Sequence, residues 1–371
     1  MPDSDPLTYK NHLKRAYFVK YGEKVLAITD TSCYHLAEET ALLAANLPEK
    51  GKKEAYLCFL SGLGVTKPEK IFEKLLDIGA LHINVARTWK DIAGMVISPK
   101  LRLIGPQLQE KVLGSIGVGA AGLKRSAGAL CWLSFPGLIW GIALLFSGPG
   151  ASQASPSGNA SGLAVLLLVI ASSLLHELGH SFAAAASGIG FRPIGFSVYL
   201  IYPVFYTNVS GIDKLDLKAK AFIDCGGFIP QSIFLFFLLM VSSAFGSAAA
   251  AEAARWIVYI VLFNLNPLLR TDGYWLYKDI YAELKASPWA RAMHYLYLSA
   301  FFVFSVYFLW FIYSRLGGFW GELKILARSP EYLFQGGYRI LLGAYFIFLG
   351  LTGGLRRFKE GRKEWDELRR S

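Results

Sequence analysis

The sequence predicts a mainly α-helical, polytopic membrane protein of about six transmembrane helices, with a membrane-side β-hairpin and a small α+β, winged-helix-like domain before it. Two observations lead to this class. Hydrophobic residues make up 54% of the 371 residues, and they dominate only after about Arg125. Beyond that point, several apolar stretches are long enough to cross a hydrocarbon core of about 30 Å. Residues 1–92 are mixed and charged instead, and they carry short strand and helix patterns.

The N-terminal domain, residues 1–92, begins with a predicted strand pair. Residues 16–29 read as two short strands that turn at Gly22. Asp30 or Thr31 is then expected to cap a helix that runs to about Ala45.

A second helix and a strand complete this domain. Thr66 and Glu69 are predicted to form a capping box around Pro68. The helix that follows presents one apolar face, made of Ile71, Phe72, Leu75 and Leu76, and Gly79 leads into a strand at 80–85. This order of elements is similar in pattern to the PqqD-like winged-helix domains, which bind leader peptides. We therefore expect a cytosolic peptide-recognition domain.

Residues 93–125 are interpreted as a linker and interfacial segment, because Pro99 and Pro106 punctuate them and Lys124 and Arg125 mark the edge of the first span. The membrane-embedded domain is predicted at 126–354. Its six expected spans lie near 126–147, 162–187, 220–245, 253–269, 293–314 and 332–354.

The net charge of +11 fits a membrane protein better than a nucleic-acid-binding protein. The Lys and Arg residues gather in 1–125 and in the basic tail, residues 355–371. Because cytoplasmic segments of membrane proteins carry the excess of positive charge, we expect a multi-pass protein of the cell membrane with both termini in the cytosol. The lipid bilayer is then a partner and nucleic acid is not. The oligomeric state stays open.

Four cysteines, Cys33, Cys58, Cys131 and Cys225, show no paired spacing, so they are expected to be reduced thiols. Residues 191–210 are rich in Phe, Ile, Val and Tyr and contain Pro193 and Pro203. They predict a hairpin at the membrane. Its edge could take up an unwound peptide by strand addition, or the hairpin could simply plug a cavity.

The motif HELGH lies inside the second predicted span. His176 and His180 are four residues apart, so on a helix both imidazoles face the same way, with Glu177 beside them. Two histidines in this spacing with an adjacent glutamate are typical of a zinc site that carries its own general base. Ionisable groups within a membrane span are costly, which favours a functional role.

Catalytic zinc keeps three protein ligands and one open position, so a third ligand is needed. Asp272 is the best candidate. Pro267 is expected to break the fourth span and let the chain turn back, and Gly273 relieves the close approach. The irregular backbone would be tolerated there because an active-site cavity is wet.

With both motifs in view, the chain resembles the site-2 protease family of intramembrane zinc metalloproteases. HExxH matches at His176, Glu177 and His180, and N-x-x-P-x-x-x-x-D-G matches at Asn264 through Gly273. The flanking sequence at 202–209 and 266–276 looks most like the bacterial branch known as peptide zinc metalloproteases. The resemblance implies Zn²⁺ held by His176, His180 and Asp272, with Glu177 as the catalytic base. It also implies that Asn264 binds the substrate backbone or the oxyanion, although a helix-to-helix hydrogen bond is the alternative for this residue.

The sequence therefore predicts a zinc metalloendopeptidase that cleaves a membrane-associated peptide or precursor, in maturation or leader removal. Two alternatives stay open. The substrate could be a membrane-anchored signalling protein released by regulated intramembrane proteolysis. Alternatively, the chain could be a zinc-containing transporter or immunity protein that binds a peptide without cutting it, although the intact base at Glu177 argues against this.

Overall fold

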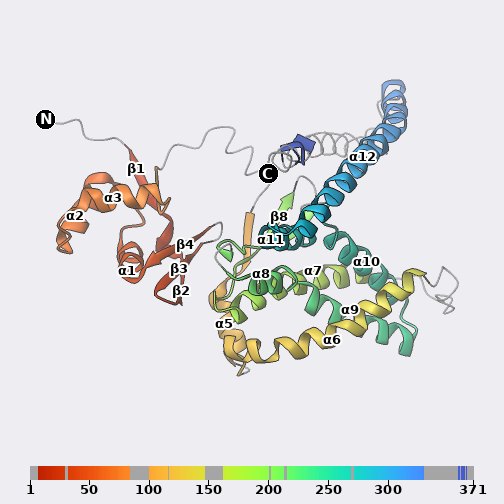
Figure 1. The fold of residues 1–371 in the computed structure, drawn as a ribbon, viewed down its shortest axis with the longest axis horizontal. Coiled ribbons are helices and arrows are strands. Elements are labelled where there is room, and N and C mark those ends of the chain that lie inside the picture. Colours follow the sequence, from red (N-terminus) through yellow and green to blue (C-terminus); the bar gives the residue numbers. More distant parts are fainter. Residues whose placement is uncertain are drawn as a thin grey trace. The chain divides into compact units, whose positions relative to one another are not determined.

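The computed structural model describes residues 7–29, 32–83, 100–115, 117–146, 162–199, 202–212, 215–268, 271–329, 358–359, 361–363 and 365 (Figure 1). The chain divides into two compact units, Met1–Leu265 and Asn266–Ser371. We describe each unit by itself. The sixth predicted span, 332–354, lies outside the described residues.

The N-terminal domain contains two three-stranded antiparallel sheets and three helices. One sheet has the order β5-β1-β6 and the other β2-β3-β4. The elements are β1 (Thr8–Asn11), η1 (His12–Arg15), β2 (Tyr17–Tyr21), β3 (Lys24–Ile28), β4 (Cys33–Ala37), α1 (Glu38–Asn46), β5 (Lys50–Lys52), α2 (Lys53–Gly62), α3 (Pro68–Asp77) and β6 (Leu81–Ile83). Its core gathers fully buried side chains from strands and helices alike, among them Leu13, Tyr56, Leu60 and Phe72.

The predicted strand pair is confirmed as β2 and β3, joined at Gly22 with a positive φ of 59°. The predicted first helix begins too early. Residues Cys33–Ala37 form a third strand, β4, which pairs along its whole length with β3, and the helix starts only at Glu38. Strand pairing outweighs local capping here, because it satisfies the backbone groups of β3 on its second edge.

The capping box predicted at Thr66 is wrong, because the N-cap of α3 is Lys67 and makes no side-chain cap bond. The apolar face of α3 is confirmed. Phe72 and Leu75 are buried, and Ile71 and Leu76 pack against the same core.

The segment predicted as a linker is part of a third sheet. β7 (Lys100–Ile104) pairs with β8 (Ile194–Tyr199), and β8 pairs with β9 (Tyr202–Thr207), all antiparallel. The predicted hairpin is thereby confirmed as β8 and β9. Helix α5 (Pro106–Ser115) follows β7 and leads towards the membrane domain. A strand from before the first span therefore covers one edge of β8, and β9 is an edge strand of this sheet.

Four long helices pack together in the membrane domain. They are α6 (Ala120–Phe146), α7 (Gly162–Ala186), α9 (Phe228–Phe245) and α10 (Ala248–Asn264), and the short α8 (Leu217–Asp224) leads into α9. Figure 1 shows α6, α7 and α9 running alongside one another. Their shared core comes mostly from small and aliphatic residues of α9 and α10, including Ala253, Ala254 and Ile257.

Three helical segments are long and apolar enough to cross a membrane: Ala120–Leu144, Gly162–Ala186 and Leu217–Phe245. They coincide with the first three predicted spans and support membrane association. At about 1.5 Å per residue, the 25 residues of α7 extend about 37 Å. The fourth predicted span corresponds to α10, which has 17 residues and ends at Asn264. The count of six spans and the orientation of the termini stay predictions.

The second unit contains α11 (Asp272–Leu284) and α12 (Pro288–Arg328). They contact each other through a stack of rings, in which the centroids of the Tyr281 and His294 rings are 3.9 Å apart. Tyr277 Oη lies 2.6 Å from His294 Nδ1. The predicted break around Pro267 is confirmed, since α10 ends at Asn264 and α11 begins at Asp272.

Candidate metal centre

Helix α7 carries the two histidines on one face. His176 and His180 are 4% and 6% exposed, so both imidazoles are withdrawn from the surface. Their rings meet edge to face, with centroids 4.8 Å apart. The two Nε2 atoms lie 3.1 Å from each other. The helical spacing alone brings the rings together, but it does not decide which nitrogen of each ring faces inward.

The other nitrogen of each ring is held by an oxygen acceptor. His176 Nδ1 lies 2.9 Å from Oε1 of Gln231, and His180 Nδ1 lies 2.7 Å from the main-chain oxygen of Ile223. The Ile223 oxygen can only accept, and Oε1 of Gln231 offers an acceptor to the other ring, so this arrangement favours a ring proton on each Nδ1. In a neutral imidazole with its proton on Nδ1, Nε2 is the nitrogen that can bind a metal.

This arrangement fits a metal ion. Two nitrogens bound to a tetrahedral zinc ion at about 2.05 Å are about 3.3 Å apart, close to the separation of the two Nε2 atoms. A cation at this point would also relieve the repulsion between the Nε2 lone pairs of that tautomer. Outer acceptors on the non-ligating nitrogen are the usual companions of metal-binding histidines.

The segment between α8 and α9 comes unusually close to α7. A Cβ atom added at Gly179 would lie 2.3 Å from the carbonyl oxygen of Gly226. One added at Gly227 would lie 2.6 Å from both Cε1 of His176 and Nε2 of His180. The absence of a side chain at Gly227 therefore leaves the space beside the metal-binding nitrogens open. The Phe228 ring packs edge-on against His176, with centroids 5.2 Å apart.

Glu177 is half-buried on α7. Its main-chain oxygen accepts a hydrogen bond of 2.8 Å from Oγ1 of Thr207, the last residue of β9. This bond connects the edge strand β9 to α7 at Glu177, the residue that is predicted to be the general base.

The third predicted ligand begins α11. Asp272 belongs to the second compact unit of the chain, whereas the two histidines belong to the first. Asp272 is half-buried. Asn264, the last residue of α10, is also half-buried. The catalytic roles of Glu177 and Asn264 stay predictions.

A buried polar network also contacts α7, at Ser181. Ser181, next to His180, donates to Oε1 of Gln109 at 2.6 Å and accepts from the main-chain nitrogen of Arg192 at 2.7 Å. Gln109 Nε2 donates to the main-chain oxygen of Arg192 at 2.7 Å. These bonds join α5, α7 and the start of the hairpin. The neighbouring Glu110 accepts from the Tyr17 hydroxyl at 2.9 Å, which connects α5 to the N-terminal domain.

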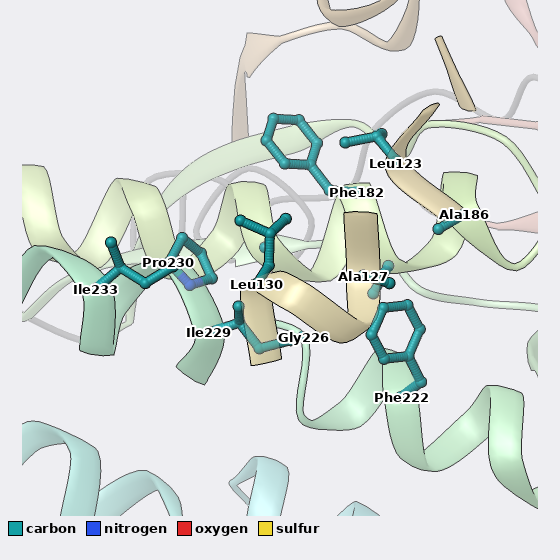
Figure 2. Close-up of a pocket in the computed structure, with 12 residues that line it drawn as sticks. Leu123, Ala127, Leu130, Phe182, Ala186, Phe222, Gly226, Ile229, Pro230 and Ile233 are labelled. Atoms are coloured by element: carbon teal, nitrogen blue, oxygen red, sulfur yellow. The ribbon is translucent and has the colours of Figure 1, made fainter. Parts of the chain in front are cut away.

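An apolar pocket lies on the face of α7 that carries Gly179 (Figure 2). Its lining holds none of the predicted metal ligands. The residues come from α6, α7, α8 and α9 and the turn before α9: Leu123, Ala127, Leu130, Gly179, Phe182, Ala183, Ala186, Phe222, Gly226, Ile229, Pro230 and Ile233. It is therefore separate from the chemistry of the histidine pair.

Sequence reasoning missed Gln231, the carbonyl of Ile223 and the role of Gly227. Gly226 allows α7 and the turn before α9 to pack closely, since a Cβ atom added there would lie 2.7 Å from Cβ of Ala183. A glutamine inside an apolar span was the available signal for Gln231, since a buried amide needs partners.

Comparison with known proteins agrees with a zinc site. No family model matches the chain, and no solved structure matches it. The chain is similar in sequence to a protein whose name describes a zinc metalloprotease. It is 26% identical over 132 residues to the "Putative peptide zinc metalloprotease protein YydH" of Bacillus subtilis (strain 168), over 34% of this chain and 52% of that protein. The chain thus spans about half the length of this relative, and the likeness supports a zinc metalloprotease family at the coarsest level.

Proposed function

We infer that this chain is a membrane zinc metalloendopeptidase of the site-2 protease type, which cleaves a membrane-associated peptide or precursor during its maturation. The observation that carries this proposal is the buried pair His176 and His180 next to Glu177, with the two Nε2 atoms 3.1 Å apart and an oxygen atom at each Nδ1. Asp272, the first residue of α11, is the proposed third ligand, because it stands in the second motif that resembles the site-2 protease family and supplies a carboxylate.

Zinc bound there would polarise a water molecule and a substrate carbonyl, and would bring the pKa of the water towards about 7. Glu177 would accept a proton from the attacking water and later deliver it to the leaving amine. Asn264 is proposed to donate its side-chain amide to the substrate backbone or to the developing oxyanion. Cleavage then proceeds without a covalent link between the chain and its substrate.

Substrate is proposed to bind along β9. β8 is covered by β7 on one side and by β9 on the other, and β9 is an edge strand of the described sheet. An extended peptide can add to such an edge through main-chain hydrogen bonds, which exposes its scissile bonds. The bond from Thr207 to the Glu177 carbonyl supports this route, because it links the edge strand to the proposed base.

The N-terminal domain is proposed to capture the substrate or its leader. Leu26 and Ile28 of β3 pack in one cluster with Ala184 and Ile189, which follow His180 in the sequence, and with Ile223, whose main-chain oxygen contacts His180. A peptide held by the first sheets would therefore be held close to the end of α7.

The test is co-expression of the full chain with a candidate peptide encoded nearby, followed by intact mass spectrometry. The wild type is expected to yield two new termini, whereas Glu177→Gln keeps zinc and yields none. Glu252→Gln is the matched control, since Glu252 lies on α10 and its partners are Arg255 and Trp256. Full cleavage by Glu177→Gln would overturn the assigned base. Peptide and zinc bound by the wild type without new termini would favour a non-proteolytic binder.

A further inference from the structure

We propose that Gln231 is a positioning residue for the metal centre: it holds the His176 ring in the tautomer and orientation that direct Nε2 towards the metal. This inference rests on the proposed zinc site. It concerns α9, which contributes no proposed ligand of its own.

The position of Gln231 leaves its amide little freedom. Its side chain is fully buried, with 0% exposure. Oε1 lies 2.9 Å from His176 Nδ1, and Nε2 donates to Oγ of Ser172 at 3.2 Å. Ser172 precedes His176 by one helical turn on α7 and is itself fully buried. In this orientation the amide NH₂ group donates to the Ser172 hydroxyl and the amide carbonyl faces the ring.

The orientation of this amide decides whether His176 can bind a metal. With the carbonyl towards Nδ1, the ring proton stays on Nδ1 and Nε2 keeps its lone pair. With the NH₂ group there instead, Nδ1 would have to accept and the proton would move to Nε2, which faces His180 Nε2. That tautomer offers no lone pair to zinc.

The two histidines differ in how they are held. His180 donates to a main-chain carbonyl, that of Ile223, which no side-chain substitution removes. His176 depends on a side chain from another helix. Gln231 can reach His176 because α7 and the start of α9 lie close together. A Cβ atom added at Gly179 would lie only 2.3 Å from the Gly226 carbonyl oxygen. Gln231 is therefore the place where the geometry of the centre can be altered without changing a ligand.

The experiment measures zinc affinity of the full chain in detergent, by competition with a fluorescent chelator. Gln231→Leu keeps the size but removes the acceptor, and affinity is expected to fall about 10- to 100-fold, the usual effect of losing an outer partner of a ligating histidine. Gln231→Glu keeps an acceptor at the same reach and is expected to stay within about tenfold of the wild type or to bind more tightly. Rescue by this variant distinguishes positioning from mere packing.

Two further variants complete the set. Ser172→Ala removes the hydrogen-bond partner of the Gln231 amide nitrogen, and a smaller loss of zinc affinity is expected. Ser232→Ala, the adjacent buried residue on α9, is the matched control and should bind zinc as the wild type does. The visible spectrum of the cobalt(II)-loaded chain is expected to change in Gln231→Leu and not in Ser232→Ala.

The outcomes separate this inference from the proposed function. Wild-type zinc affinity and a wild-type cobalt spectrum in both Gln231→Leu and Ser172→Ala would overturn the positioning role. If Gln231→Leu fails to fold without metal, Ser172→Ala and Gln231→Glu decide the question in the same way. A wild-type chain that binds no zinc would overturn the proposed metal centre itself.

Discussion

Nε2 of His176 and Nε2 of His180 lie 3.1 Å apart, and Nδ1 of each ring lies within hydrogen-bonding distance of an oxygen atom from outside α7. This pairing is preorganised, because the rings are set by contacts with Gln231 and Ile223 from outside α7. A centre built in this way binds a metal with little rearrangement.

Removal of metal should abolish cleavage reversibly. Because the proposed mechanism needs zinc to activate water, a strong chelator is expected to stop product formation in the co-expression or detergent assay, and added zinc should restore it. His180→Ala should lose zinc and cleavage together, whereas Glu177→Gln should lose cleavage alone. Cleavage that continues in chelated protein would contradict the metal mechanism.

Gly227→Ala should weaken zinc binding through a steric effect on the imidazoles. Gly227 has φ −63° and ψ −36°, which alanine adopts readily, so the backbone is not strained. The new methyl group would instead press on both rings at 2.6 Å. We expect zinc affinity to fall at least about tenfold, corresponding to about 1.4 kcal/mol.

Gly128→Ala is the control for this change, because an added Cβ there meets nothing within 4 Å. Equal zinc affinity in Gly227→Ala and the wild type would show that the open space beside the nitrogens is not needed.

Thr207→Val should slow cleavage while zinc stays bound. Valine keeps the shape of threonine and its preference for strands, but it cannot donate to the Glu177 carbonyl. Loss of this bond is expected to cost about 0.5–1.5 kcal/mol, equivalent to about a 2- to 13-fold drop in kcat/KM if the bond aligns β9 during catalysis. Thr207→Ser keeps the hydroxyl and should retain the rate. Unchanged kinetics in Thr207→Val would leave the bond with a purely structural role.

Gln109→Leu should destabilise the fold. It removes two buried hydrogen bonds, to the Ser181 hydroxyl and to the Arg192 carbonyl, which then keep their mutual bond of 3.1 Å. The loss of the two bonds is expected to cost about 1–3 kcal/mol in total. The expected result is a lower unfolding midpoint in detergent, measured by heat or denaturant. Gln107→Leu, on the exposed side of the same helix, is the control and should leave the midpoint close to that of the wild type. Equal midpoints for both variants would contradict a stabilising role for the network.

Local patterns predicted the parts of the fold that depend on local forces. The strands around Gly22, the apolar face with Phe72 and Leu75, the hairpin at 194–207 and the helix break near Pro267 all follow from periodicity, turns and the missing donor of proline. The early start predicted for the first helix failed because Cys33–Ala37 can pair with a strand, which a capping signal does not reveal.

The sequence by itself determined which residues form the candidate site, because the spacing of His176 and His180 on a helix places their rings on one side, with Glu177 adjacent. Only the tertiary structure decided how those rings are held. Gln231 lies 55 residues from His176 in the sequence. Strand β7, which precedes the first predicted span, pairs with β8, and Thr207 of β9 donates to the Glu177 main-chain oxygen. These contacts depend on how separate elements pack, and a periodic pattern records only which face of an element is buried.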